Sequence, residues 1–343
     1  MKPIQSLKKR LSWPCRERVR RLSSLLGEFA GAYGADSPTV KALRAELRFA
    51  KLALVFSTRI ARGLATPGFR TYAPVLAAML GWDASICVRG SGGALMLGDM
   101  ALPSPQNKRE RKLLDDGLAD IILPSLLARR DPESAALYER LYQASFPGLL
   151  DVPLEGPYEW GAVTLTQGDV VVDAGANVGY FSAMASHFGC EAHAFEPMPI
   201  AAAALRRTAA LHSGIRAQPY ALWDKAETLS FGESAQSIQS SSFLSGGGKG
   251  KGRQTVQAQA VSLDSFVEEC GLARVDFIKA DIEGAERNML MGARRVLRDF
   301  APKLAICAYH LPDDRAALRG LILEANPRYV VEDRFQKLYA HVP

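Results

Sequence analysis

Cysteine is scarce in this chain of 343 residues, and its five cysteines are scattered. Their number is odd and no two form a CxxC pair, which argues against both a disulfide framework and a structural zinc site. Long apolar runs are lacking as well. The start of the chain is basic, but residues 13–16 interrupt the apolar region that a signal peptide needs, and the apolar stretch of residues 49–65 contains Lys51, Arg59 and Arg62. We therefore expect neither a signal peptide nor a membrane span, and a cytoplasmic location.

Acidic residues are scarce only in the first part of the chain. Residues 1–150 hold 23 Lys and Arg against 13 Asp and Glu, whereas residues 151–343 hold 19 against 23. Much of the basic excess lies in an arm at residues 1–25, which could contact anionic lipid, glycan or nucleic acid, or could be a solvated, partly helical terminus. No groove-reading motif accompanies the arm, so a nucleic-acid partner is disfavoured, while peripheral membrane contact stays open.

The residue pattern changes near residue 150. Before this point, apolar spacing predicts two helices and a turn within residues 41–80, a short hairpin within 85–102 and another helix at 109–127. We expect a mainly helical N-terminal region of unassigned role at 1–150, followed by a separate domain at 151–343.

Strand-like and helical segments alternate in residues 151–343. The apolar run of residues 170–172 predicts a central strand that is buried on both faces. Further strands are expected at 191–195, 215–222, 275–280 and 304–308, and a closing hairpin at 329–332 and 338–341. Helices are expected between them, at 180–188, 200–212, 262–270, 285–300 and 314–326. This alternation predicts an α/β fold with a doubly wound, mostly parallel sheet and an antiparallel C-terminal edge.

A Ser/Gly-rich stretch at residues 234–252 interrupts this alternation. It holds too little apolar surface to define one conformation, so we expect a loop. The loop could be an inert insertion or a lid over a substrate.

A turn of the form GxNxG follows the central strand. Gly175 and Gly179 allow the backbone to turn tightly and to approach a ligand before the next helix begins. The dinucleotide fingerprint GxGxxG is absent, and Asp173 stands where it would repel a pyrophosphate and attract an ammonium group. The turn therefore favours S-adenosylmethionine over NAD.

Glu196 ends the next predicted strand, 23 positions after Asp173. A carboxylate at this place can accept hydrogen bonds from both hydroxyls of a ribose. Together, the turn and the acid form a more specific signal than either does alone, although two unrelated strand-end loops are the alternative.

Three acids, Asp281, Glu283 and Glu286, follow the predicted strand at 275–280. The carboxyl edge of such a sheet is where ligands bind, so Asp281 is placed to face the reacting methyl or the accepting group. Glu283 and Glu286 could instead stabilise the first turn of the following helix through its dipole.

His310 follows the last predicted parallel strand. A histidine with a pKa near neutrality can take the proton of an accepting hydroxyl. An ordinary surface or hydrogen-bonded histidine explains the residue equally well.

These residues resemble the FkbM family of S-adenosylmethionine methyltransferases, a subset of the class I Rossmann-like methyltransferase fold. The resemblance covers about residues 155–343 and rests on the segments 171–181, 195–197, 221–224, 278–286 and 309–314. Two positions depart from the usual pattern: Ala280 replaces a larger apolar residue, and Trp223 replaces a small one, where it could reshape an adenine pocket.

The resemblance implies a seven-stranded class I sheet, S-adenosylmethionine as cofactor and transfer of its methyl group, usually to a hydroxyl of a sugar or another natural product. The cofactor would lie among Asp173, Gly175, Asn177, Gly179, Tyr180, Phe181, Glu196, Pro197, Ala221 and Asp281. Asp281, Glu283 and His310 would lie on the acceptor side.

We accordingly expect an O-methyltransferase that acts on a small-molecule or glycan acceptor, with His310 or Asp281 as the base. Asp281, Glu283 and His310 could also hold Mg²⁺ or Mn²⁺. The rival hypotheses are N-methylation of a small molecule or protein, and a non-catalytic binding module that keeps the fold.

Overall fold

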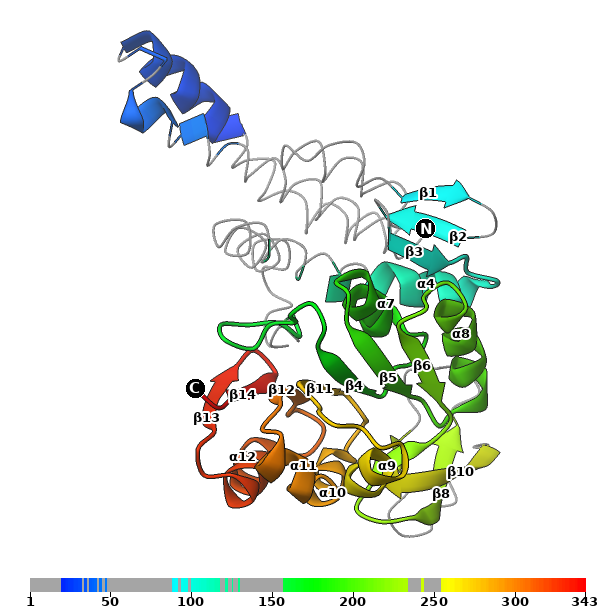
Figure 1. Cartoon of the computed structure of the whole chain (residues 1–343). Helices are drawn as coiled ribbons and strands as arrows, with labels where there is room; N and C mark the ends of the chain where they lie inside the picture. The colour runs from blue at the N-terminus through cyan, green and yellow to red at the C-terminus, as the bar shows by residue number, and fades with distance from the viewer. Residues whose placement is uncertain are drawn as a thin grey trace. The chain divides into compact units, whose positions relative to one another are not determined.

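The computed structural model describes the C-terminal half almost completely and the N-terminal half in parts. The described residues are 20–32, 34, 35, 37–41, 43, 44, 47, 88–91, 94–97, 100–117, 121, 122, 125, 129, 157–233, 242, 243 and 254–343. The chain divides into two compact units, one of residues 1–88 and 126–153 and the other of residues 89–125 and 154–343 (Figure 1).

A seven-stranded sheet forms the centre of this unit. Its order is β13-β14-β12-β11-β4-β5-β6, and β14 runs in the direction opposite to the other six strands. The strands are β4 (Val170–Ala174), β5 (Glu191–Phe195), β6 (Ile215–Gln218), β11 (Phe277–Ala280), β12 (Lys303–Cys307), β13 (Val330–Arg334) and β14 (Lys337–His341). The predicted fold class is confirmed, including the antiparallel strand near the C-terminus.

Helices cover both faces of the sheet, α7 and α8 on one face and α9 to α12 on the other (Figure 1). They are α7 (Tyr180–His187), α8 (Pro199–Ala209), α9 (Leu263–Glu269), α10 (Glu286–Met291), α11 (Arg294–Asp299) and α12 (Asp314–Ala325). Because both faces are covered, Val171 and Val172 in β4 are fully buried although they point to opposite sides.

The strand predicted at 215–222 is wrong, because two strands of different sheets occupy this range. β6 ends at Gln218, and β7 (Ala221–Trp223) pairs in parallel with β10 (Gln254–Ser262) in a separate four-stranded sheet. Pro219 lies between them and has no backbone N–H for a ladder, so the chain can change sheets there. β8 (Glu227–Glu233) and β9 (Ser242–Phe243) complete the second sheet, and β9 lies within the stretch predicted as a loop.

The single helix predicted at 285–300 is also wrong, since it is broken into α10 and α11 at Gly292. A Cβ at this position would lie 2.0 Å from the carbonyl oxygen of Trp223. Because Gly292 has no side chain, the end of α10 can approach the backbone of β7 closely. The second sheet therefore packs against α10.

Residues 89–125 belong to the same compact unit as the main sheet. The predicted hairpin at 85–102 is found as three strands, β1 (Val88–Ser91), β2 (Ala94–Leu97) and β3 (Met100–Pro103), which form a small sheet. α4 (Lys108–Gly117) follows and packs against α7. The predictions for residues 41–80 and for the arm before residue 20 fall largely outside the described residues.

None of the helices in the described part of the chain has the length and apolar composition that crossing a bilayer requires.

Replacing Gly292 with Ala tests the contact between α10 and β7. We expect Gly292→Ala to lower the free energy of unfolding by about 1–3 kcal/mol, because the new methyl group must displace backbone. The matched control is Gly320→Ala in α12, where nothing lies within 4 Å of the added Cβ. That change should raise stability by roughly 0.5–1 kcal/mol through helix propensity. Urea unfolding followed by circular dichroism measures both, and equal effects would contradict the close contact.

Candidate functional site

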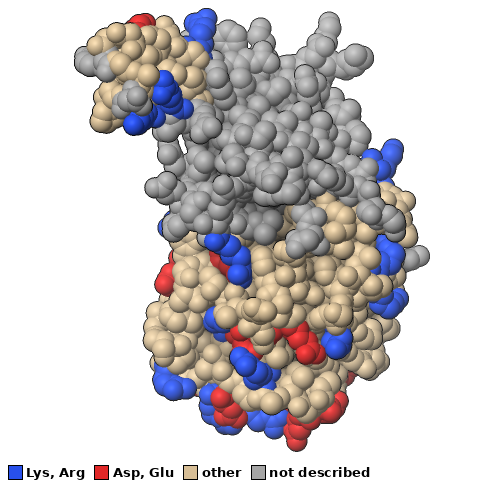
Figure 2. Space-filling view, turned by 45° about the horizontal axis from the view of Figure 1, so that its top comes forward, with Lys and Arg blue, Asp and Glu red and all other residues tan. Residues whose placement is uncertain are grey.

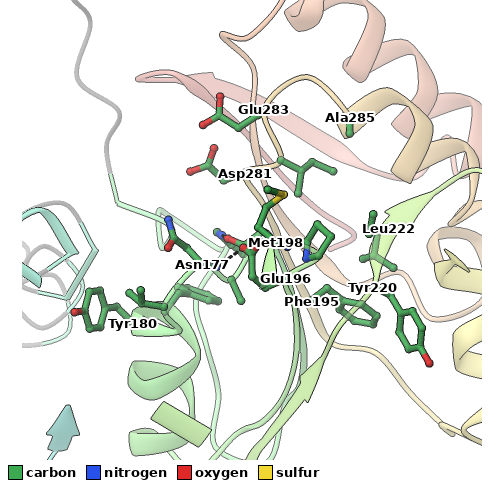
Figure 3. Close-up of a pocket in the computed structure, with 18 of the residues that line it drawn as sticks. Asn177, Tyr180, Phe195, Glu196, Met198, Tyr220, Leu222, Asp281, Glu283 and Ala285 are labelled. Atoms are coloured by element: carbon green, nitrogen blue, oxygen red, sulfur yellow. Dashed lines mark hydrogen bonds between the residues drawn. The ribbon is translucent and has the colours of Figure 1, made fainter. Parts of the chain in front are cut away.

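A cavity of about 380 Å³ opens at the carboxyl ends of β4, β5 and β11. Figure 3 shows Tyr220 and Leu222 at one end, Asp281 and Glu283 at the other, and Glu196 between them. Its volume lies in the range of small-molecule and cofactor sites, and its position is the one that open α/β sheets use for ligands.

The turn after β4 forms the floor of the cavity. Gly175 has φ 72°, and a Cβ there would lie 2.0 Å from the carbonyl oxygen of Asp281, so only glycine fits. The N–H groups of Gly175 and Ala176 donate to the carbonyl oxygen of Phe195 at 3.1 and 2.9 Å. The turn is thereby held against the ends of both neighbouring strands.

Glu196 lies at the end of β5 and lines the cavity with 6% of its surface exposed. Its Oε2 accepts from the N–H of Asn177 at 2.9 Å and its Oε1 accepts from the N–H of Met198 at 2.8 Å. Burial raises the pKa of Glu196 to about 7, although these two donors act against the shift. The glycine turn and Glu196, which were predicted to form one site, are therefore joined by a hydrogen bond.

Asp173 lies beneath the turn and is fully buried. Its Oδ2 accepts from the hydroxyl of Ser182 at 2.6 Å, and its Oδ1 lies 3.0 Å from Nζ of Lys279. The residues that line the cavity include Lys279 but not Asp173. The expected attraction of Asp173 for a cationic ligand stays a prediction. Its negative charge is already paired with Lys279.

Lys279 in β11 is the cation that pairs with Asp173. Burial would lower the pKa of Lys279, but the charges of Asp173 and Asp281 outweigh burial and raise it. The side chain is therefore a charged ammonium group in the centre of the domain.

Asp281 is the acid at the far end of the cavity. Its Oδ2 accepts from the hydroxyl of Tyr158 at 2.7 Å, and the hydroxyl of Tyr309 lies 3.5 Å from its Oδ1. Burial would raise the pKa of Asp281, but the charge of Lys279 and the bond from Tyr158 hold it below its ordinary value. An ionised carboxylate therefore lines the cavity at this end.

His310 lies behind Asp281 and is not among the residues that line the cavity. Its Nδ1 is 3.0 Å from Oε1 of Glu286, and its Nε2 is 3.6 Å from Asp281 and 3.7 Å from Glu283. Burial favours the neutral imidazole, but these three carboxylates raise the pKa of His310 to about 9. The ring is protonated at neutral pH.

Glu286 has no exposed surface and holds the loop before α10. Its Oε1 accepts from the N–H of Ile282 at 2.9 Å and its Oε2 accepts from the N–H of Gly284 at 3.0 Å. The residue thus does more than balance a helix dipole, because it fixes the loop that carries Asp281 and also pairs with His310.

The other predicted cofactor residues also lie at the cavity. Gly175, Asn177, Tyr180, Phe181, Pro197 and Ala221 line it, and Gly179 begins α7 in a left-handed conformation with φ 86°. Sequence reasoning missed Tyr158, Lys279 and Lys337, which line the cavity too. Lys279 lies within the segment 278–286 that carries the family resemblance, but the sequence indicated no role for it. Nothing in the local pattern around Tyr158 distinguishes it from an ordinary core aromatic.

A mostly parallel seven-stranded sheet in this order, with the antiparallel strand β14, a glycine turn after the central strand and an acid after the next one, defines a class I methyltransferase fold. Residues 173–335 match the model of the methyltransferase FkbM domain.

One curated relative is the 31-O-demethyl-FK506 methyltransferase FkbM of Streptomyces tacrolimicus, 31% identical over 159 residues. The match covers 38% of this chain and 61% of the relative, so the chain spans less than two thirds of that protein's length. Among solved structures, a methyltransferase FkbM from Methylobacillus flagellatus KT is similar with a TM-score of 0.41 and 23% identity, over 68% of this chain and 62% of the other. Aeropyrum pernix fibrillarin with natively bound S-adenosyl-L-methionine gives a TM-score of 0.31 and 14% identity, over 52% and 67%.

Replacing Glu286 with Gln tests the charge arrangement around His310. Loss of the negative partner should lower the pKa of His310 from about 9 toward the ordinary value of 6.5. Because the folded-state pKa lies above the unfolded one, the pair stabilises the protein below pH 6.5 and loses this effect as the pH rises through about 9. Glu286→Gln should therefore flatten the alkaline fall in the free energy of unfolding.

An NMR titration of the His310 Cε1 proton in metal-free buffer measures this shift. His193 is the internal control, since burial lowers its pKa and it lies in β5 away from Glu286. A His310 pKa that stays near 9 in the variant would refute the assignment of Glu286 as the main partner.

Proposed function

We propose that the C-terminal domain is an S-adenosylmethionine-dependent O-methyltransferase that acts on a hydroxyl group of a sugar, glycan or other natural product. The observation that carries the proposal is a single cavity with a buried carboxylate, Glu196, at its middle and an ionised carboxylate, Asp281, at its far end. The match of residues 173–335 to the methyltransferase FkbM domain supports the reaction type.

The residues at the cavity fit the cofactor in its chemistry. Phe195, Met198, Tyr220 and Leu222 offer an apolar wall suited to an adenine ring. Glu196 can accept hydrogen bonds from ribose hydroxyls. The bound cofactor supplies an electrophilic methyl group on a sulfonium.

Asp281 would serve the acceptor. An attacking hydroxyl must lose its proton as the methyl group is transferred, and the carboxylate of Asp281 faces the cavity where it can take or orient that proton. His310 lies behind Asp281 and would hold its position and charge rather than touch the acceptor. Transfer then depends mainly on positioning, without a covalent intermediate on the protein.

The residues fit a divalent metal less well. Ligand atoms of Asp281, Glu286 and His310 lie within 4.8 Å of one another. However, both oxygens of Glu286 already accept backbone N–H groups, and Oδ2 of Asp281 accepts from Tyr158. We assign no step to a metal, and the set of Asp281, Glu283 and His310 stays a prediction.

A small acceptor also agrees with the surface. On the described part of the face seen in Figure 2, basic and acidic side chains lie interspersed and form no continuous basic area. A nucleic-acid acceptor would favour such an area near the cofactor.

Asp281→Asn tests the acceptor role. Transfer of a radiolabelled methyl group from S-adenosylmethionine to a panel of hydroxylated sugars and natural products should fall by roughly 10²–10⁴-fold, because the proton acceptor is lost. Cofactor affinity, measured by calorimetry, should change only a few-fold. If Asp281→Ala and His310→Ala both kept normal rates, the site assignment would be wrong. Methylation of amines alone would favour the N-methyltransferase alternative.

The pH dependence of cofactor binding tests Glu196. Ribose hydroxyls bond best to an ionised carboxylate, and burial raises the pKa of Glu196 to about 7. Affinity for S-adenosylmethionine should therefore weaken by up to about tenfold for each pH unit below that value. Calorimetry between pH 5.5 and 8.5 measures the slope, and Glu196→Gln should abolish it. If the wild-type protein failed to bind the cofactor at millimolar concentration, a non-catalytic module would be favoured instead.

A further inference from the structure

Lys279 is a buried cation that lines the cavity, and beyond its effect on the pKa of Asp281 it has been given no role at the cofactor turn. It lies in β11 with 4% of its side chain exposed. A charged side chain in such a place is costly unless several partners compensate it, so its contacts indicate what it does.

Three acceptors surround the ammonium group. Nζ lies 3.0 Å from Oδ1 of Asp173, and it donates to the carbonyl oxygens of Ala174 at 3.1 Å and Gly175 at 2.7 Å. The two carbonyls accept hydrogen bonds from the ammonium group, and the contact with Asp173 is an ion pair. The side chain thus joins the end of β4 to the neighbouring strand β11.

Two of these acceptors belong to the turn that forms the cavity floor. The carbonyl of Ala174 also accepts from the N–H of Asp281 at 3.2 Å, so it is held by the strand ladder as well. Among the bonds of the described residues, Lys279 is the donor that reaches the carbonyl of Gly175. The orientation of this peptide group, and with it the left-handed turn, depends on the lysine.

The contact between Lys279 and Asp173 determines the net charge beneath the cavity floor. Because Lys279 compensates Asp173 within the protein, the floor of the cavity carries no net charge from this pair. Asp173 also accepts a hydrogen bond from Ser182, and it is not among the residues that line the cavity.

We infer that Lys279 is a positioning residue of the cofactor site, which holds the carbonyls of Ala174 and Gly175 in the binding conformation and cancels the charge of Asp173. The inference rests on the proposed function, since it takes S-adenosylmethionine as the ligand of this turn. The cofactor is then received by the shape and backbone groups of the turn, and Asp173 acts only through Lys279.

The test compares three variants by calorimetry with S-adenosylmethionine, each at a temperature where circular dichroism shows it folded. Lys279→Met leaves Asp173 buried without a partner and should lower both the melting temperature and cofactor affinity. The double variant Asp173→Asn with Lys279→Met removes the stranded charge and should recover much of the melting temperature. Its affinity should stay about 10- to 100-fold weaker than that of the wild type, because the turn carbonyls still lack their donor.

Lys303→Met is the matched control. Nζ of Lys303 lies 2.8 Å from Oδ2 of Asp169 and donates to the carbonyl oxygen of Thr164 at 2.6 Å. This pair has the same chemistry, but Lys303 begins β12 at the opposite, amino edge of the sheet. We expect a lower melting temperature with cofactor affinity unchanged.

Two results would overturn the inference. Recovery of wild-type affinity in the double variant would mean that Lys279 serves only to neutralise Asp173. Equal loss of affinity in Lys279→Met and Lys303→Met would mean that the effect is general destabilisation. Absence of binding by the wild-type protein is a different outcome, since it would refute the proposed function and the inference with it.

Discussion

The ion pair between Lys279 and Asp173 is the contact on which the rest of the domain depends. It joins the neighbouring strands β4 and β11 near their carboxyl ends. Both side chains are almost completely buried, and removal of one partner of such a pair typically costs about 3–5 kcal/mol. The glycine turn and the loop that carries Asp281 both begin within two residues of this pair, so its geometry fixes the distance between the cofactor floor and the acceptor end.

The ionisable groups in and behind the cavity have different protonation states. Glu196 has a pKa of about 7 because burial dominates, whereas Asp281 stays ionised because Lys279 and Tyr158 outweigh burial. His310 is kept protonated by the carboxylates around it. These groups thus differ through their neighbours, which places a negative charge at the acceptor end of the cavity and its compensating positive charge behind it.

Much of this domain could be predicted from sequence, because its signals are local. The apolar run at β4 and the turn after it determined the central strand, and Glu196 and Asp281 were located by their positions at strand ends. The second sheet was missed because β10 buries small residues such as Ala258 and Ala260, whose alternation with Gln257 and Gln259 gives a weak apolar pattern. Tyr158 and Lys279 were missed for another reason. Their roles come from contacts with residues far along the chain, and such contacts leave no mark in the local sequence.

The central claim is that the cavity above the Gly175–Gly179 turn receives S-adenosylmethionine, and amide NMR tests it most directly. On titration with the demethylated product S-adenosylhomocysteine, the account predicts shifts at the amides of Asn177 and Met198, whose N–H groups bond to Glu196. The amide of Gly271, at the end of α9 and away from the cavity, should not move. Shifts confined to residues outside the cavity, or no saturable shifts at all, would contradict the account.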